Sequence, residues 1–244
     1  MRKRLVLIIA ALLATIAAQA KTLVVYYSFT NNVRTIVNDL SEQIDADVIR
    51  IEPAEKGLDY AANGYAIGSA QIAAIRNNPN DAASYPSIDP VDVRIADYDM
   101  VIVATPLWWN NMAAPMQTFL FQYGKDMADK HVALIVSSAS SGISEVVADA
   151  KRLIPEGKFV EPNLWIRSSQ VSNCHNLTEQ WLKDIGYESL TSAVSTINTD
   201  EAIEKIGTYN LNGQTVKNDN NATGIVLIQQ KKAGRVYTKK YLAK

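Results

Sequence analysis

The most informative part of the sequence is Lys21-Thr-Leu-Val-Val-Tyr-Tyr-Ser-Phe-Thr-Asn-Asn-Val-Arg34. Its apolar run from Leu23 to Tyr27 predicts a buried strand, and a helical pattern begins near Val33. The turn between them is rich in hydroxyl and amide side chains. Such a turn directs backbone N–H groups and the positive end of the helix at one point, which suits a phosphate. An ordinary Ser/Thr/Asn helix cap would explain the same residues, so the turn alone leaves both interpretations open.

The alternation of strand and helix continues along the chain. Helical periodicity predicts helices over residues 33–44, 58–76, 112–123, 143–154 and 177–185. Apolar runs predict further strands over residues 47–51, 100–104, 131–136 and 159–166. We therefore expect an α/β fold, a three-layer α/β/α sandwich with a five-stranded parallel sheet.

Three loops follow predicted strands, and each carries residues suited to a ligand. They are the first loop (residues 28–33), the tryptophan loop (residues 105–111) and the serine loop (residues 137–142). In parallel sheets, ligands bind beyond the carboxyl ends of the strands. We therefore expect these three loops to meet at one edge of the sheet and to form one site.

The tryptophan loop and the serine loop each allow more than one interpretation. Trp108 and Trp109 offer large flat rings for stacking on a planar ligand, or they close the hydrophobic core. The small residues of the serine loop let backbone approach a planar ligand. A serine nucleophile is the competing interpretation, but neither His131 nor His175 has a spacing that links it to this loop. Cys174 and His175 are adjacent, which is not a spacing of metal ligands.

Taken together, these loops resemble the flavodoxin family over about residues 22–188. The first loop, Ser28-Phe-Thr-Asn-Asn-Val33, is similar to the family's Ser-x-Thr-Gly-Asn-Thr. Tyr98-Asp-Met-Val-Ile-Val-Ala-Thr-Pro-Leu-Trp-Trp109, followed by Pro115 and Thr-Phe-Leu120, resembles the longer branch with a Trp-Trp loop. The sequence departs from the family at Asn31, which replaces Gly, and at Val33, which replaces Thr. Ala139 and Ser140 replace two glycines of the serine loop.

The resemblance implies flavin mononucleotide (FMN) as cofactor, with no catalytic side chain and no metal. The hydroxyls of Ser28 and Thr30 would donate to the phosphate, and one tryptophan would pack against the flavin ring. The implied contacts are Ser28, Phe29, Thr30, Asn31, Asn32, Val33, Pro106, Leu107, Trp108, Trp109, Asn110, Ser138, Ala139, Ser140 and Gly142.

The N-terminus has the pattern of a secretory signal peptide over residues 1–20. Three basic residues precede an apolar run, and Ala18-Gln-Ala20 matches a cleavage site, so we expect cleavage after Ala20 and a periplasmic or secreted protein. The apolar run is too short for a comfortable membrane span, and we expect none after cleavage. The single cysteine excludes an internal disulfide.

Charge is distributed unevenly along the chain. Residues 21–200 hold 13 Lys and Arg against 22 Asp and Glu, whereas residues 201–244 hold 8 against 3. The acidic charge of residues 21–200 argues against nucleic acid as a partner and favours electrostatic steering toward basic partners. An acidic surface that serves only solubility explains the same charge equally well. We expect a flavodoxin-like domain over residues 21–198 and a small antiparallel β module over residues 201–244.

The C-terminal module has its own signals. Two short strands flank an Asn212-Gly213 turn, and further strands are expected at residues 224–229 and 235–242. The module resembles C-terminal β tails of secreted proteins in some Gram-negative bacteria, which implies a sorting signal. A β element that only packs on the first domain is the alternative.

Two functions stay open at this point. The first is an exported FMN protein that transfers electrons, either as a carrier for a redox partner protein or as a reductase of small quinone-like or nitro compounds. The alternative is an exported binding or surface module of the same fold that has lost the flavin. The sequence leaves the oligomeric state open.

Overall fold

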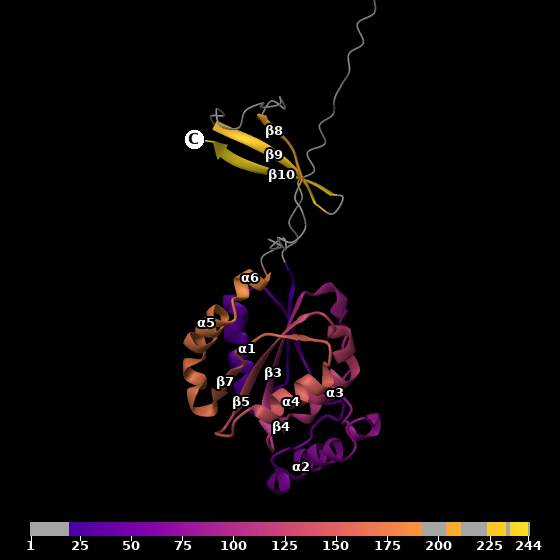
Figure 1. Ribbon diagram of the computed structural model, residues 1–244. Coiled ribbons are helices and arrows are strands. Elements are labelled where there is room, and N and C mark those ends of the chain that lie inside the picture. The colour runs from indigo at the N-terminus through magenta and orange to yellow at the C-terminus, as the bar shows by residue number, and fades with distance from the viewer. Residues whose placement is uncertain (1–19, 192–203, 211–223, 233–234, 244) are drawn as a thin grey trace, which may run out of the picture. The chain divides into compact units, whose positions relative to one another are not determined.

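The computed structural model describes residues 20–191, 204–210, 224–232 and 235–243 (Figure 1). The chain divides into two compact units between Val194 and Ser195, and each is described by itself. The expected signal peptide lies outside the described residues except for Ala20. In the described part of the chain, no helix is both long and apolar enough to cross a membrane.

The first unit is built on a parallel sheet with the strand order β2-β1-β3-β5-β6. This order and the flanking helices confirm the expected flavodoxin-like α/β fold. The last position of the sheet is shared by two short strands, because β6 and β7 pair with successive parts of β5. The single strand expected at residues 159–166 is therefore wrong. The strands are β1 (Thr22–Tyr26), β2 (Asp47–Arg50), β3 (Met100–Trp108), β5 (His131–Ser138), β6 (Lys158–Phe159) and β7 (Leu164–Arg167).

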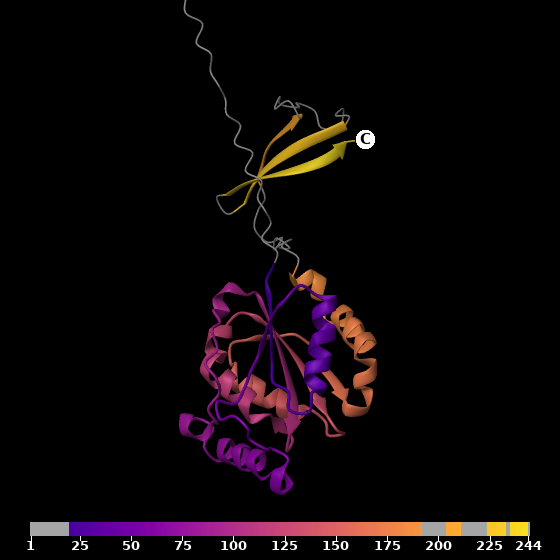
Figure 2. The same ribbon diagram turned by 180° about the vertical axis from the view of Figure 1, so that it is seen from behind.

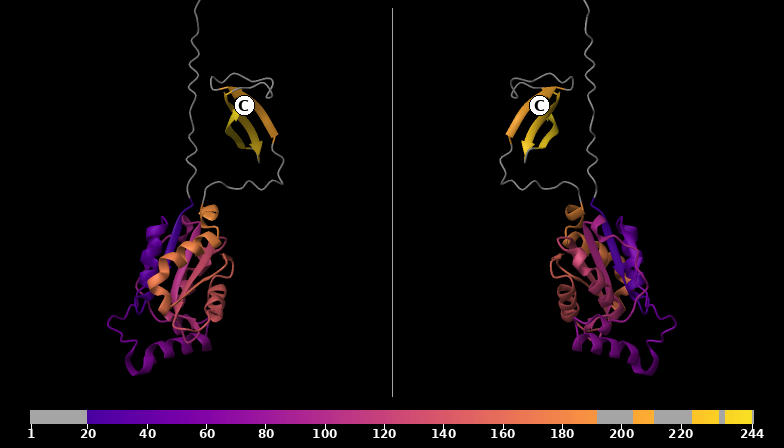
Figure 3. Two further views of the ribbon diagram at one scale, coloured as in Figure 1. Left: turned by 90° about the vertical axis from the view of Figure 1, so that its left-hand side faces the viewer. Right: turned by 90° about the vertical axis from the view of Figure 1, so that its right-hand side faces the viewer.

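Helices cover both faces of this sheet, as Figure 2 and Figure 3 show. One face packs against α1 (Asn32–Gln43) and α5 (Cys174–Asp184), which α6 (Tyr187–Thr191) follows. The other face packs against α3 (Ala114–Tyr123) and α4 (Ser144–Leu153). A longer helix, α2 (Ala62–Asn77), lies next to α3 and β3.

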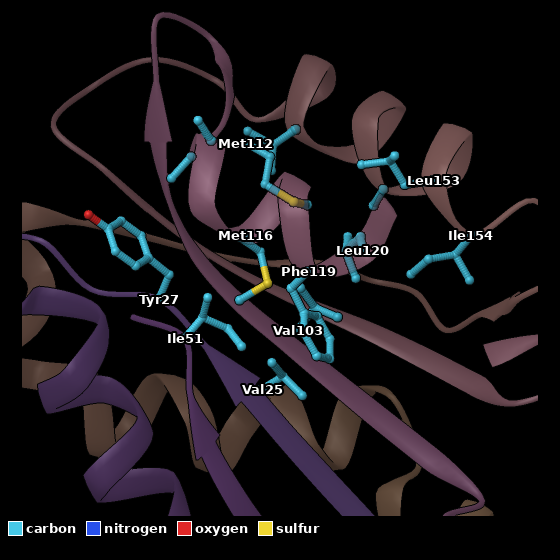
Figure 4. Packing of buried hydrophobic residues seen from close by; sticks show 14 of the residues in the cluster. Val25, Tyr27, Ile51, Val103, Met112, Met116, Phe119, Leu120, Leu153 and Ile154 are labelled. Carbon is cyan, nitrogen blue, oxygen red and sulfur yellow. The ribbon is translucent and has the colours of Figure 1, made fainter. Parts of the chain in front are cut away.

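The hydrophobic core follows from alternation along β1. Leu23 and Val25 belong to the cluster under α3 and α4, whereas Val24 and Tyr26 belong to the cluster under α1 and α5. Successive side chains of a strand point to opposite faces, so one apolar run supplies both clusters. Figure 4 shows Phe119 of α3 beside Val25 in the first cluster.

Several boundaries differ from the expectations. β3 continues to Trp108 because its end pairs with a short antiparallel strand, β4 (Asn111–Met112), so Pro106 to Trp108 lie in a strand and not in a loop. β5 likewise includes Ser137 and Ser138. α2 begins at Ala62 and not at residue 58, and residues 63–65 at its start have positive φ angles. α5 begins at Cys174 and not at residue 177.

Short 3-10 turns complete the unit: η1 (Ala82–Ser84), η2 (Ile95–Asp97), η3 (Gly124–Met127) and η4 (Ser168–Asn173).

The second unit contains an antiparallel sheet with the order β10-β9-β8. Its strands are β8 (Glu204–Asn210), β9 (Gly224–Lys232) and β10 (Arg235–Ala243). A register shift between Lys205 and Gly207 interrupts the pairing of β8 with β9. The Asn212-Gly213 turn and the short strand expected after it lie outside the described residues.

Candidate functional site

A cavity of about 330 Å³ lies beyond the carboxyl ends of β1, β3 and β5. All three loops contribute to its wall, so the structure brings them together at one edge of the sheet, as expected. The start of α2 and the first residue of η4 complete the wall. The lining residues are Ser28, Phe29, Thr30, Asn32, Val33, Tyr60, Tyr65, Gly68, Pro106, Leu107, Trp108, Trp109, Ser137, Ser138, Ala139 and Ser168.

Most residues expected at the site line this cavity, and four do not: Asn31, Asn110, Ser140 and Gly142. Asn31 and Asn110 occupy turn positions with positive φ. Ser140 and Gly142 are exposed residues outside the wall.

The first loop combines a helix cap with a group of free donors. The Ser28 hydroxyl oxygen accepts a hydrogen bond from the Arg34 N–H of α1 at 3.2 Å. Asn31 precedes the helix with φ 65° and makes no side-chain cap bond. Among the described residues, the backbone N–H groups from Phe29 to Val33 find no acceptor. The loop is therefore a helix cap, and it also presents several N–H groups at the positive end of α1, which suits an anion.

The Trp-Trp segment forms a tight β-hairpin. Trp108 of β3 pairs with Asn111 of β4, which leaves Trp109 and Asn110 as a two-residue turn. Both turn residues have positive φ, 45° and 70°, as type I′ hairpin turns require. A tryptophan in this backbone region is uncommon and costs about 1–3 kcal/mol, which the surrounding structure must offset.

The two tryptophans have different environments. Trp108 is 9% exposed and packs among aromatic rings, with its centroid 5.6 Å from Tyr27 and 5.0 Å from Tyr60. Trp109 is 39% exposed and lies edge-on to Trp108. Core packing is therefore the role of Trp108, and Trp109 is the ring of this pair with surface left for a ligand.

Three other parts of the wall were missed by sequence reasoning. Tyr60, Tyr65 and Gly68 come from the start of α2 and the segment before it, and Ser168 comes from η4. Tyr65 is 52% exposed and has a φ of 65°. A glycine inside an Ala-rich helical stretch was the available signal for Gly68, because such a glycine often marks a close approach.

Hydrogen bonds tie the serine loop to the rest of the site. The Ser138 hydroxyl accepts from Trp165 Nε1 at 2.8 Å and donates to the Ser141 carbonyl at 2.8 Å. The Ser168 hydroxyl donates to the Ser138 carbonyl at 3.3 Å and accepts from Asn32 Nδ2 at 3.2 Å. The Ser138 hydroxyl is thus engaged in the fold, and Ser137 and Ala139 are the other residues of this loop that line the cavity.

The histidines do not activate a serine at this site. His131 is the first residue of β5, at the end of the strand opposite the cavity. His175 Nδ1 lies 3.0 Å from Asp39 Oδ1, between α1 and α5. Neither lines the cavity, so the arrangement does not support nucleophilic catalysis by the serine loop.

The cavity wall combines aromatic rings with small hydroxyl side chains and carries no charged side chain. Its lining residues include no Asp, Glu, Lys, Arg or His. Burial raises the pKa of Tyr60, which lines the cavity, and that of Tyr27, which packs behind Trp108. Both phenols therefore stay protonated at neutral pH, and the positive potential for an anion comes from backbone N–H groups and the helix end.

Comparison with known proteins decides the family. The flavodoxin family model matches residues 21–185. This chain belongs to the flavodoxin family. Its fold is similar to that of a Bacteroides eggerthii protein described as a flavoprotein, at 22% identity and a TM-score of 0.55, covering 68% of this chain and 98% of that one. A related Bacteroides uniformis structure has 23% identity and a TM-score of 0.53, covering 68% of this chain and 99% of that one.

A flavoprotein from Lactobacillus acidophilus, solved in complex with FMN, is also similar to this chain. It shares 21% identity with a TM-score of 0.50, and the match covers 63% of this chain and 97% of that one. The family model ends at residue 185, before the C-terminal unit. These likenesses show the fold of the first unit.

The departures from the flavodoxin motif have structural explanations. Asn31 stands where the motif has glycine, and it adopts the left-handed conformation that glycine would supply. Val33 stands where the motif has threonine. It is 1% exposed and packs with Ile36 and Val37 in the core, so it has no hydroxyl to offer and contributes its backbone. Ala139 is exposed at the cavity wall, and Ser140 lies outside it.

Proposed function

We propose that this flavodoxin-family protein binds FMN in the cavity and uses it to transfer electrons. The observation that carries the proposal is the union of two features in one uncharged cavity. One is the group of unpaired N–H donors at the start of α1, and the other is the aromatic wall at Trp109. A phosphate needs the first and an isoalloxazine ring needs the second.

The phosphate would be held by the first loop. The N–H groups of residues 29–33 find no acceptor among the described residues, and Thr30 is exposed in the same loop. Ser28 Oγ accepts its bond from Arg34, so its own proton stays available for a phosphate oxygen. Because no cationic side chain lines the cavity, the donors and the dipole of α1 would carry the whole charge interaction.

The ring would lie between the hairpin and the serine loop. Trp109 would stack on it, and backbone of residues 107–110 and 138–142 would approach its edge. FMN supplies the electron chemistry when it is bound, so no side chain has to act as an acid or a base. The chain's residues bind the cofactor, orient it and exclude water from it. The FMN complex of the similar Lactobacillus acidophilus flavoprotein supports this choice of ligand.

Titration with two flavins tests the proposal. Residues 21–244 are purified without flavin, and FMN or riboflavin is added while flavin and tryptophan fluorescence are followed. The fluorescence of FMN should be quenched when FMN binds. FMN should also bind at least about tenfold more tightly than riboflavin, because only FMN has the phosphate. If neither flavin binds, the proposal is wrong and the flavin-free binding module is the better description.

The electron acceptor separates the two forms of the proposed function. A carrier would pass electrons to a redox partner protein, whereas a reductase would accept them from NAD(P)H and reduce a small quinone-like compound. Stopped-flow mixing of the FMN-loaded protein with NADPH or NADH decides between them. Direct flavin bleaching within seconds supports the reductase, and bleaching that needs an added reductase protein supports the carrier.

We also propose that the protein is exported. Cleavage after Ala20 would leave Lys21, whose N–H donates to Asp99 at 3.0 Å just ahead of β1, so the mature chain would keep all contacts of the first strand. Cell fractionation and N-terminal sequencing test this proposal. Deletion of residues 201–244 tests the proposed sorting role of the tail: unchanged location would leave only the structural role.

A further inference from the structure

A polar network contacts the Trp109 hairpin without lining the cavity. Arg76, in the last turn of α2, donates from Nη2 to the Trp109 carbonyl at 2.6 Å and from Nε to Asn111 Oδ1 at 2.7 Å. Asn111 Nδ2 in turn donates to Asp149 Oδ2 of α4 at 2.9 Å. Arg76 therefore bonds to two points of the hairpin at once: the backbone carbonyl of Trp109 and the side chain of Asn111.

The far end of the network is anchored in the core. Asp149 is 8% exposed, and its Oδ2 also accepts from the Met112 N–H at 3.0 Å. Its Oδ1 accepts from Arg152 Nη2 at 3.2 Å. A buried carboxylate that accepts three hydrogen bonds, one of them from a guanidinium, has a single favoured position, so it gives Asn111 a fixed support.

The network is needed because the turn is strained. Type I′ turns favour Asn-Gly, but here a tryptophan occupies the first positive-φ position. Without an external hold, Trp109 would relax toward ordinary φ values and its indole would leave the cavity wall. None of Arg76, Asn111, Asp149 and Arg152 lines the cavity, so they can act on a ligand only through the hairpin.

We propose that Arg76 is a positioning residue: it fixes the Trp109 turn, supported by Asn111 and Asp149, so that the indole forms one wall of the ligand cavity. The part of this inference that concerns the flavin rests on the proposed function. Arg76 is an exposed residue at the end of a helix, which makes its replacement compatible with folding.

A double-mutant cycle tests the inference. Arg76→Ala should weaken the binding of FMN and of riboflavin by the same factor, about tenfold, because the indole meets the ring and not the phosphate. In a Trp109→Ala background the same substitution should change affinity by less than about twofold, since its target is gone. Arg76→Lys should fall between, because one ammonium cannot serve both acceptors of the planar guanidinium. Arg94→Ala removes a surface arginine that pairs with Asp97, and it serves as the control.

Two results would overturn the inference: unchanged affinity in Arg76→Ala, or an equal loss in both backgrounds. A second measurement, made on the flavin-free protein, tests the inference independently of the proposed function. The Trp109 signal is isolated as the difference between the wild type and Trp109→Phe. Arg76→Ala should change its near-UV circular dichroism and raise its quenching by acrylamide. If the wild type binds no flavin, the proposed function is wrong, but the positioning role of Arg76 can still be tested. An unchanged Trp109 signal in flavin-free Arg76→Ala would overturn that positioning role.

Discussion

Gly68 and Trp109 are in such close contact that a Cβ atom on Gly68 would lie 3.0 Å from Cζ3 of the indole. The same Cβ would lie 3.4 Å from Cε3 of Trp108. The absence of a side chain at this position of α2 therefore lets the helix surface come against the hairpin. Gly68, which the sequence did not identify as a site residue, thus lies against the Trp-Trp motif, which it did identify.

Gly68→Ala should affect the ligand more than the fold. Alanine favours the helix by up to about 1 kcal/mol, while its methyl group displaces the end of the Trp109 ring by a few tenths of an ångström. We expect the free energy of unfolding to change by less than about 1 kcal/mol and FMN affinity to fall about fivefold. Urea denaturation and flavin titration measure the two quantities.

Ser69→Ala is the matched control, because Ser69 is the exposed neighbour in the same helix. It should leave both quantities unchanged. Wild-type affinity in Gly68→Ala would mean that the position of Trp109 does not influence flavin binding.

Ser28→Ala should separate capping from phosphate binding. Loss of the cap to the Arg34 N–H should lower the free energy of unfolding by about 1 kcal/mol. Loss of the free hydroxyl proton should weaken FMN about tenfold and leave riboflavin unaffected, because riboflavin has no phosphate. Ser41→Ala, which removes a hydroxyl bonded to the Val37 carbonyl in the same helix, is the control for both titrations. An equal loss for both flavins would assign Ser28 to the fold alone.

Replacement of Asn31 tests the left-handed turn. Asn31 has φ 65° and no side-chain cap bond, so its backbone conformation is the main property at stake. Asn31→Ala should lower the free energy of unfolding by about 1 kcal/mol, whereas Asn31→Gly should keep or raise it. At Asn38, an exposed interior position of α1, the order should reverse, with alanine more stable than glycine by about 1 kcal/mol. The same order at both positions would contradict the role of the turn.

Stability should decrease in alkali because of buried tyrosines. Burial raises the pKa of Tyr27, with a further contribution from nearby Tyr60, above the ordinary value of 10.0. Above that value the unfolded chain releases the proton and the folded chain keeps it, so the folded state binds more protons. The contribution of Tyr27 to the free energy of unfolding should therefore be constant below about pH 10 and fall as pH rises beyond it.

Tyr27→Phe isolates this effect. The variant cannot ionise at this position, so its free energy of unfolding should fall less steeply above about pH 10, while Tyr60 maintains part of the slope. Urea midpoints at about pH 8 and about pH 11 measure it. Parallel curves for the two proteins would show that Tyr27 ionises alike in the folded and unfolded chain.

Local sequence patterns predicted most of the α/β framework. The apolar runs at Leu23–Tyr27 and Met100–Ala104 identified central strands, because strands buried on both faces read as continuous apolar segments. The same patterns missed the division of the last strand position, where residues 160–163 separate β6 from β7 and each short strand pairs with its own part of β5. The end of β3 was missed because Pro106 suggests a loop, whereas Pro106 pairs with Ser137 of β5 and the next two residues pair with β4.

By itself, the sequence determined the strand-to-helix junction at Ser28–Val33, the family and the three loops that meet at one edge, because turns, caps and apolar periodicity act over a few residues. Only the tertiary structure decided which tryptophan belongs to the core and which to the cavity. It also decided that α2 supplies both Gly68, which lies against the indole of Trp109, and Arg76, which donates to the Trp109 carbonyl. The physical reason is that a strained turn at Trp109 is stable only when partners distant in sequence hold it, and no local pattern records such partners.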